Sequence, residues 1–308
     1  DIDVNTNEIR DSYGIAITSL LQGSGQWYSD GWPSVCNIRY NSVRNVPGHT
    51  GIDSHGGSYL YIQDNYVFNT NYGIVGQAAD REGRAEPILD HCFIERNTIE
   101  NPGNHPFQFY RFIMVIAENS NKRVTETYIR NNTIFYTQRP SSESQASGIM
   151  IANVDRLSIE GNRIFNGPVG SCNGGLYFSS NSEEKVSNVI VKGNWIKDWG
   201  AAIAFRIDAL DGEISFFNNI VNSHYRPFVA GGGILTKNIS IYNNTFLSAK
   251  GSVFPNVVDF AVDGLVTVTS DASLNILNNI IGFTSGDPAG RYIFGPGIVN
   301  GNLEINNN

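Results

Sequence analysis

Residues 60–67 read LYIQDNYV, and the same phrase returns as CFIERNTI at residues 92–99 and as TYIRNNTI at residues 127–134. Each copy centres on an Asn, with mostly apolar residues five and three positions before it and an apolar residue two positions after it. A repeat of 24 to 35 residues predicts a solenoid in which each copy forms one coil. The shared residue of the successive copies is Asn7, Asn41, Asn65, Asn97, Asn132, Asn162, Asn194, Asn219, Asn244, Asn279 and Asn308.

The apolar positions of the phrase predict strands. Apolar residues that alternate within short segments rich in β-branched residues indicate strands with one face turned inward. Stacked coil upon coil, these positions predict three continuous apolar ladders. We expect the shared Asn to lie at the bend between two strands, where it adopts the left-handed conformation and its side-chain amide bonds to the amides of adjacent coils.

This pattern resembles the right-handed parallel β-helix proteins of the pectate-lyase-like class, and the resemblance covers essentially the whole chain. It implies an all-β fold, a single-stranded right-handed parallel β-helix (solenoid) of about eleven coils. We expect residues 1–308 to form one such domain. Because ladder positions are occupied from Ile2 to Ile305, we expect a neighbouring domain or subunit to cap the solenoid ends.

Composition narrows the classes of partner. The chain has 308 residues, of which 16% are charged, 32 are Gly and 37 are Asn, and its net charge is −8. An acidic chain is not expected to bind nucleic acid, and no apolar run in the sequence is long enough to cross a membrane. We expect a secreted protein, or one exposed on a cell or virion surface.

The cysteines fit the same repeat. Cys36 and Cys92 occupy one position of the phrase in coils two apart, with Leu60 between them. A strand spacing of about 4.8 Å separates them by roughly 10 Å, too far for a disulfide, so we expect both in the core. Cys172 has no partner at metal-type spacing, and the sequence predicts no metal site.

A second strand follows each Asn and predicts an outer surface. In segments such as TGIDSH (50–55) and YGIVGQ (72–77) the third residue is apolar, so the fourth and sixth residues are expected to face outward. The same alignment applied to HPFQFY (105–110) places Tyr72 beside His105. The resulting polar and aromatic strip, predicted to bind an extended sugar chain, contains Asp53, His55, Gln77, Gln108, Tyr110, Tyr177 and Arg206, with His49 and Arg81 as further substrate-binding candidates.

The sharpest local signal is the Asp-x-His of residues 51–55, GIDSH. Two residues apart on a strand, both side chains emerge on one face. Residues 51–67 resemble the mannuronan C5-epimerases, β-helix enzymes that act on alginate and carry the motif Tyr-Gly-Phe-Asp-Pro-His. The resemblance implies that Asp53 and His55 are catalytic.

The chain departs from that motif at three places. Thr50 stands where the family has its catalytic Tyr, Ser54 where it has Pro, and Asn104 where an Arg precedes the family's second His. His105 keeps that second His. We expect Tyr72, one coil from Thr50, to supply the missing phenol, which makes Asp53, His55, Tyr72 and His105 the predicted catalytic residues.

Epimerases and polysaccharide lyases share the chemistry that such residues provide. Both remove the C5 proton of a uronate and must first neutralise its carboxylate. The candidates for that neutralisation are a proton on Asp53, a Ca²⁺ ion or one of Arg44, Arg81 and Arg84.

Two other functions remain open from the sequence. A glycoside hydrolase would pair Asp53 with Asp80 or Glu82, from the charged segment ADREGRAEP (79–87). Alternatively the polar strip is ordinary solenoid surface, or the chain is a non-catalytic carbohydrate-binding protein of the adhesin or tailspike type.

Overall fold

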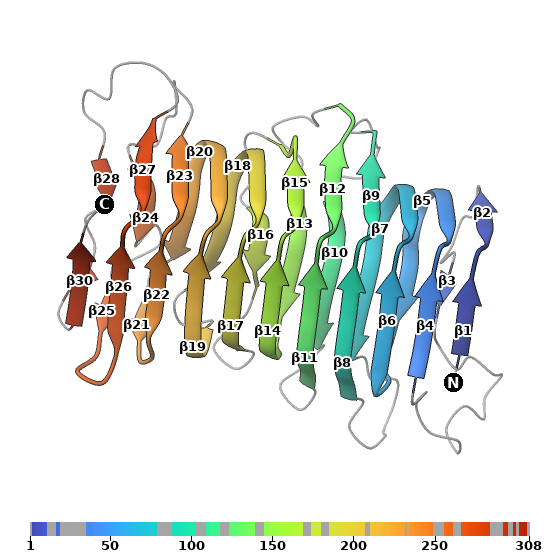
Figure 1. Cartoon of the computed structure of the whole chain (residues 1–308), viewed down its shortest axis with the longest axis horizontal. Coiled ribbons are helices and arrows are strands. Elements are labelled where there is room, and N and C mark those ends of the chain that lie inside the picture. The colour runs from blue at the N-terminus through green and yellow to red at the C-terminus, as the bar shows by residue number, and fades with distance from the viewer. Residues whose placement is uncertain are drawn as a thin grey trace.

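The computed structural model describes residues 2–10, 17–18, 35–78, 88–102, 109–117, 123–138, 145–168, 174–179, 185–206, 210–231, 233–248, 256–260, 266–283, 292–294, 298–299 and 302–306. Within these residues every regular element is a strand, and all registered pairs are parallel. The strands stack into a long prism, with the N-terminal strands at one end and the C-terminal strands at the other (Figure 1). This all-β parallel solenoid confirms the predicted fold class.

One wall of the prism is an 11-stranded sheet. Its strand number agrees with the prediction of about eleven coils, and each coil contributes the segment that precedes its Asn. In order, its strands are β1 (Ile2–Asn5), β4 (Val35–Arg39), β6 (Tyr59–Gln63), β8 (Ile88–Glu95), β11 (Arg123–Arg130), β14 (Val154–Glu160), β17 (Val186–Lys192), β19 (Leu210–Phe217), β22 (Ile239–Tyr242), β26 (Ser273–Leu277) and β30 (Asn302–Asn306).

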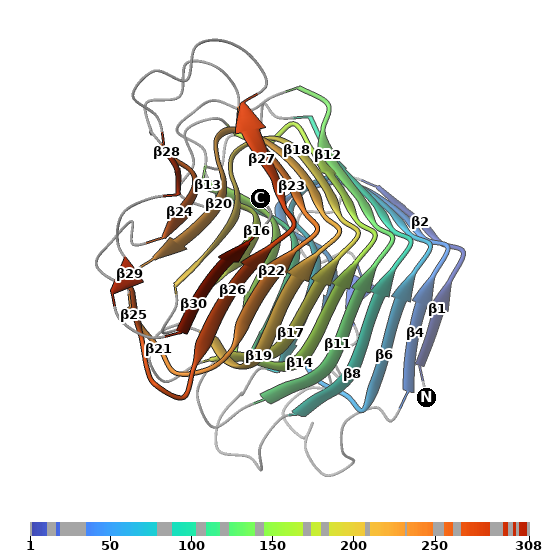
Figure 2. The ribbon, with the colours of Figure 1, turned by 60° about the vertical axis from the view of Figure 1, so that its left-hand side comes forward.

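The other walls belong to a 16-stranded sheet that follows each Asn. Its longer strands bend, as the view turned toward the helix axis shows (Figure 2). The sheet contains β2 (Glu8–Arg10), β3 (Ile17–Thr18), β5 (Ser42–Ser54), β7 (Tyr66–Ala78), β9 (Thr98–Asn101), β10 (Phe109–Ala117), β12 (Thr133–Tyr136), β13 (Gln145–Ala152), β15 (Arg163–Phe165), β16 (Gly174–Phe178), β18 (Trp195–Arg206), β20 (Ile220–Gly231), β23 (Thr245–Ser248), β24 (Asn256–Phe260), β27 (Ile280–Phe283) and β28 (Tyr292–Phe294). A separate three-stranded sheet contains β21 (Gly233–Leu235), β25 (Val266–Val268) and β29 (Ile298–Val299).

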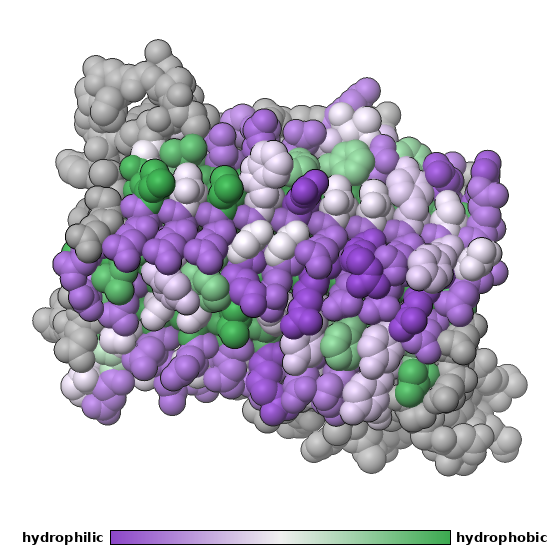
Figure 3. Space-filling model, in the orientation of Figure 1, coloured by the Kyte–Doolittle hydropathy of each residue, from purple (hydrophilic) through white to green (hydrophobic). Residues whose placement is uncertain are grey.

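The register confirms that equivalent residues of the repeat stack. Cys36 pairs with Leu60, which pairs with Cys92, so the two cysteines lie two coils apart, and both are free and buried. Ile38, Ile62 and Ile94 form the next ladder and are fully buried. The outer face of the 11-stranded sheet is largely hydrophilic, with scattered apolar side chains (Figure 3).

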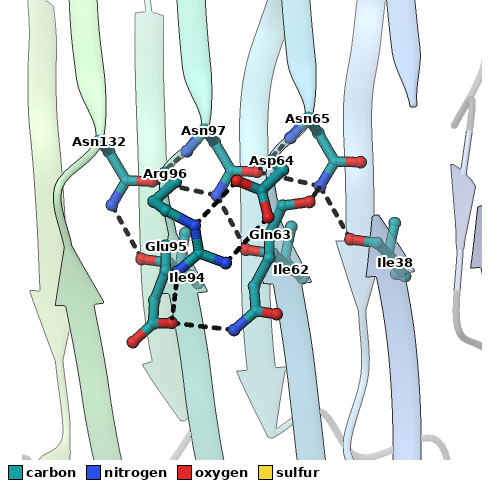
Figure 4. A network of polar contacts seen from close by, with 10 residues as sticks. All are labelled: Ile38, Ile62, Gln63, Asp64, Asn65, Ile94, Glu95, Arg96, Asn97 and Asn132. Atoms are coloured by element: carbon teal, nitrogen blue, oxygen red, sulfur yellow. Dashed lines mark hydrogen bonds and ion pairs between the residues drawn. The ribbon is translucent and has the colours of Figure 1, made fainter. Parts of the chain in front are cut away.

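The asparagines form a continuous hydrogen-bonded ladder (Figure 4). The side-chain amide of Asn65 donates to Oδ1 of Asn97 at 2.9 Å and to the backbone carbonyl of Ile38 at 2.8 Å. The backbone N–H of Asn65 donates to the same Oδ1 at 3.0 Å. This arrangement recurs from Asn41 to Asn244, so each ladder amide both donates to and accepts from neighbouring coils in the dry interior.

The predicted backbone conformation of these asparagines is wrong by one residue. The left-handed residue is the one before the ladder Asn, and its φ is 58° at Asp64, 56° at Arg96 and 64° at Gly161. This position faces outward at the bend and therefore tolerates varied side chains. Arg96 uses it to bind Asp64 of the preceding coil through Nε and Nη2, both at 2.8 Å (Figure 4).

Replacing a ladder Asn should destabilise the protein strongly. Asn162→Leu removes the donors to the Ile129 carbonyl and to Asn194, and leaves the backbone and side-chain N–H groups of Asn132 without their acceptor. Buried groups stranded in this way cost about 1–3 kcal/mol each, so we expect a loss of at least about 2 kcal/mol in the free energy of unfolding. Asn131→Gly is the control, because Asn131 is exposed at φ 56° and glycine occupies that column at Gly161. Similar denaturation midpoints for the two variants would contradict the ladder's role.

One position in an apolar column of the 11-stranded sheet predicts a gain in stability instead of a loss. Thr127 stands between Cys92 and Leu157 in an otherwise apolar column, is 0% exposed, and its hydroxyl has no hydrogen-bond partner among the described residues. Thr127→Val keeps the shape and removes the unpaired hydroxyl, so thermal unfolding should show a gain of about 1 kcal/mol. A lower melting temperature would show that this hydroxyl is satisfied.

Candidate functional site

The candidate site lies on the outer face of five neighbouring strands, β5, β7, β10, β13 and β16, which lie behind the 11-stranded sheet in Figure 1. Their register aligns the buried residues Ile52, Ile74, Ile113, Ile149 and Leu176. The next residue of each strand points outward by alternation. We call these residues the outer row: Asp53, Val75, Met114, Met150 and Tyr177.

A pair of successive inward positions brings a second set of side chains to the same face. A Cβ atom built on Gly73 or Gly175 would lie 2.7 Å from Cγ2 of Ile99 or Ile196 in the core, so these glycine positions face inward. The buried residue that follows each of them also faces inward, as at Ile74. Two successive inward positions place the preceding residue, such as Tyr72, on the outer side, although the strands stay in one-to-one register there.

Asp53, His55 and Gln77 form a hydrogen-bonded group beside this row. Nε2 of His55 lies 2.9 Å from Oδ2 of Asp53, and Nε2 of Gln77 lies 3.0 Å from Nδ1 of His55. The Gln77 nitrogen is also 2.6 Å from Nε2 of the ring, so the amide sits beside both ring nitrogens. The imidazole of His55 is therefore held between the carboxylate of Asp53 and the side-chain amide of Gln77.

The exposure of this group differs from the prediction. Asp53 and His55 were expected on an open surface, but their side chains are only 4% and 11% exposed. Oδ1 of Asp53 is buried and has no hydrogen-bond partner among the described residues. The side chain of Asp53 therefore points to the outer face of the sheet, but its carboxylate is shielded from water.

The register corrects the predicted neighbours. Thr50 pairs with Tyr72 as expected, but Tyr72 pairs on its other side with Arg111, not with His105. On the other side of β5, Thr18 of β3 pairs with Asp53. His105, Gln108, Arg81, Arg84, Asp80 and Glu82 lie outside the described residues.

Tyr110 does not belong to the strip. It is 2% exposed and packs edge-on against Tyr136 in the core, with ring centroids 6.0 Å apart, and burial raises the pKa of its hydroxyl. The error arose from aligning HPFQFY with the second strand, whereas the segment in register is RFIMVI, residues 111–116.

The remaining predicted residues lie at varied positions. Tyr177 is half-buried in the outer row, and Arg206 is exposed at the end of β18. His49 is exposed, with Nδ1 3.2 Å from Oγ1 of Thr50. The guanidinium of Arg44 stacks on the ring of Tyr66, 4.5 Å from its centroid, before the bend of β5.

Arg111 is the polar residue of this face that the sequence did not predict. Its Nη1 donates to the carbonyl of Tyr110 at 2.9 Å, and its Nε lies 3.0 Å from Sδ of Met150 in the outer row. Burial lowers the pKa of its guanidinium, and the phenols of Tyr72, Tyr177 and Tyr136 act in the opposite direction. A strand alignment that tested RFIMVI would have found it.

The family follows from comparison with known proteins. A family model described as the right-handed β-helix region matches residues 2–246, and the chain belongs to this family. Neither the curated proteins nor the solved structures provide a match. The described residues contain no group of three or more His, Cys, Asp or Glu side chains arranged to hold a metal ion. None of them belongs to a helix with the length and apolar character needed to cross a bilayer.

Burial of the Asp53 carboxylate predicts a stability effect as well as a functional one. Asp53→Ala removes the acceptor for Nε2 of His55 inside a shielded site, so we expect a loss of about 1–3 kcal/mol in the free energy of unfolding. His49→Ala, at an exposed position, should change it by less than about 0.5 kcal/mol. Equal melting temperatures for the two variants would contradict the buried Asp53–His55 pair.

Proposed function

We propose that the chain is a secreted or surface-exposed polysaccharide-active enzyme. In this proposal it is an epimerase or lyase that removes the C5 proton of a uronate in an acidic glycan such as alginate. The observation that carries it is the imidazole of His55, placed between the shielded carboxylate of Asp53 and the amide of Gln77. An imidazole held in one tautomer by a carboxylate is suited to act as a general base.

In this proposal each group has its own role. A bound sugar displaces the Gln77 amide from Nδ1 of His55, and this nitrogen takes the C5 proton. Asp53, bonded to Nε2, stabilises the imidazolium that forms, while the electron pair of the broken C5–H bond moves into the carboxylate of the sugar. The reaction therefore needs a positive group or a proton near that carboxylate.

The second proton transfer decides between the two reactions. In an epimerase the phenol of Tyr72, one coil from Thr50, returns a proton to the opposite face of C5. In a lyase the C4–O bond breaks as the C4–C5 double bond forms, and the proton goes to the leaving oxygen. Both routes use the same residues and differ in where the sugar places its leaving oxygen.

The outer row also suits a long substrate. Four registered strand pairs separate Asp53 from Tyr177, a distance of roughly 19 Å along the axis at a strand spacing of about 4.8 Å. A glycan chain lying along the axis would reach both. The outer row of β5, β7, β10, β13 and β16 contains one carboxylate, Asp53, and the second carboxylate that a glycoside hydrolase would need, Asp80 or Glu82, lies outside the described residues.

Substitutions at Asp53 and His55 test this proposal. Asp53→Asn and His55→Gln should each lower turnover by at least about 100-fold, and the double variant should lose little more, because the two groups work as one unit. Tyr72→Phe should also reduce turnover sharply while keeping the ring. Tyr128→Phe and Asp271→Asn, on the 11-stranded sheet and in an exposed turn, are matched controls expected to retain activity.

The assay separates the reaction classes on a panel of polyuronates and neutral glycans. Lyase activity appears as ultraviolet absorbance of the unsaturated sugar, hydrolysis as new reducing ends without that absorbance, and epimerase activity as C5 deuterium uptake without cleavage. Full activity of Asp53→Asn and His55→Gln would exclude this site. Binding with none of these activities would favour the non-catalytic carbohydrate-binding protein.

A further inference from the structure

Arg111 lies on the proposed substrate face, displaced along the helix axis from the Asp53–His55 pair. The register runs from Thr50 through Tyr72 to Arg111, so Arg111 is two coils from Thr50, roughly 10 Å at a strand spacing of about 4.8 Å. On its other side Arg111 pairs with Ser147, and three residues further along β10 the outer row runs from Met114 through Met150 to Tyr177. Along the helix axis Arg111 therefore lies two coils from the proposed reaction site and two coils from Tyr177.

The surroundings of the guanidinium are partly dry and hold it in one orientation. Nη1 donates to the Tyr110 carbonyl at 2.9 Å, and Nε lies 3.0 Å from the thioether of Met150. Burial lowers the pKa of Arg111, and the phenols of Tyr72 and Tyr177 are among the groups that oppose this shift. An arginine remains charged in such a place, and desolvation strengthens any hydrogen bond that it makes to an anion.

We propose that Arg111, on the same face as Tyr72 and Tyr177, binds the carboxylate of a second uronate in the same glycan chain, two units from the sugar that reacts at Asp53–His55. The inference rests on the proposed function and deepens it, because it makes the enzyme selective for chains with successive acidic sugars. A planar guanidinium pairs with a carboxylate through two parallel hydrogen bonds, and the two phenol rings can pack against sugar C–H faces. One pyranose unit advances a glycan by about one coil spacing, so the two coils between β5 and Arg111 correspond to two sugar units along the axis.

The net charge of the chain affects how it can bind an acidic glycan. At a net charge of −8 the protein repels polyanions at long range, so an acidic glycan needs a local cation at its binding face. Arg111 provides that cation on β10, and Arg206 lies further along the same sheet at the end of β18. Binding of a charged glycan should therefore depend on Arg111 and fall as salt rises.

The test compares oligouronates with their carboxyl-reduced counterparts. Tri- to hexasaccharides of mannuronate, guluronate and galacturonate are titrated calorimetrically into wild type, Arg111→Gln, Arg111→Lys and Arg163→Gln. Arg163 is an exposed arginine on β15, and Arg163→Gln is the matched control because it removes the same charge from another part of the surface. We expect Arg111→Gln to bind the charged oligomers about 10-fold or more weakly and the reduced oligomers as wild type does.

Two further readouts separate binding from a structural role. Arg111→Lys keeps the charge but loses the paired geometry, so its affinity for charged oligomers should lie between those of wild type and Arg111→Gln. On a substrate that turns over, Arg111→Gln should raise KM with kcat nearly unchanged, whereas Asp53→Asn lowers kcat.

The outcomes distinguish this inference from the proposed function. A preference for charged oligomers that depends on Arg111, in a protein with no turnover, would support the inference. It would overturn the proposal that the protein is an enzyme. Turnover that depends on Asp53 with unchanged selectivity in Arg111→Gln would overturn the inference alone. If Arg111→Gln does not fold, equal binding of charged and reduced oligomers by wild type would still overturn it, and a salt-sensitive preference retained in part by Arg111→Lys would support it.

Discussion

The amide ladder is the interaction on which the rest of the structure depends. Each ladder side chain bonds to the next coil and also to a backbone carbonyl of the preceding coil, as Asn97 does with Asn132 and Ile62. These bonds fix one residue of every coil at the strand spacing, even where the loops between copies differ in length. Because strands on both sides of the bend start from that fixed point, every other column inherits its register.

The chemistry of the outer face follows from a local departure from that regularity. Regular alternation would turn Tyr72 and Val75 to opposite sides of the sheet. The two successive inward positions, Gly73 and Ile74, place both on the outer side, and the close approach of the Phe112 carbonyl leaves no room for a Cβ at Gly73. Arg111, in register with Tyr72, contacts Met150 of the outer row, so a cation, phenols and the Asp53–His55 pair come to lie along one face.

The sequence predicted much of this arrangement because stacking repeats equivalent positions. The fold, the buried Cys36 and the neighbouring positions of Thr50 and Tyr72 all follow from the spacing of the Asn phrases. The strand after Asn97 could not be placed, because HPFQFY and RFIMVI both carry an apolar third residue and the intervening loop length is free. Burial of Asp53 was also beyond the sequence, because alternation gives the direction of a side chain and not what covers it.

The most direct test of the account is a crystal structure of Asp53→Asn with a bound oligouronate. The account predicts a glycan running along the helix axis over β5, β7 and β10, with C5 of one sugar facing Nδ1 of His55. It also predicts the carboxylate of the sugar two units away on the guanidinium of Arg111. An oligouronate bound instead on the outer face of the 11-stranded sheet, or bound across the axis away from His55, would contradict it.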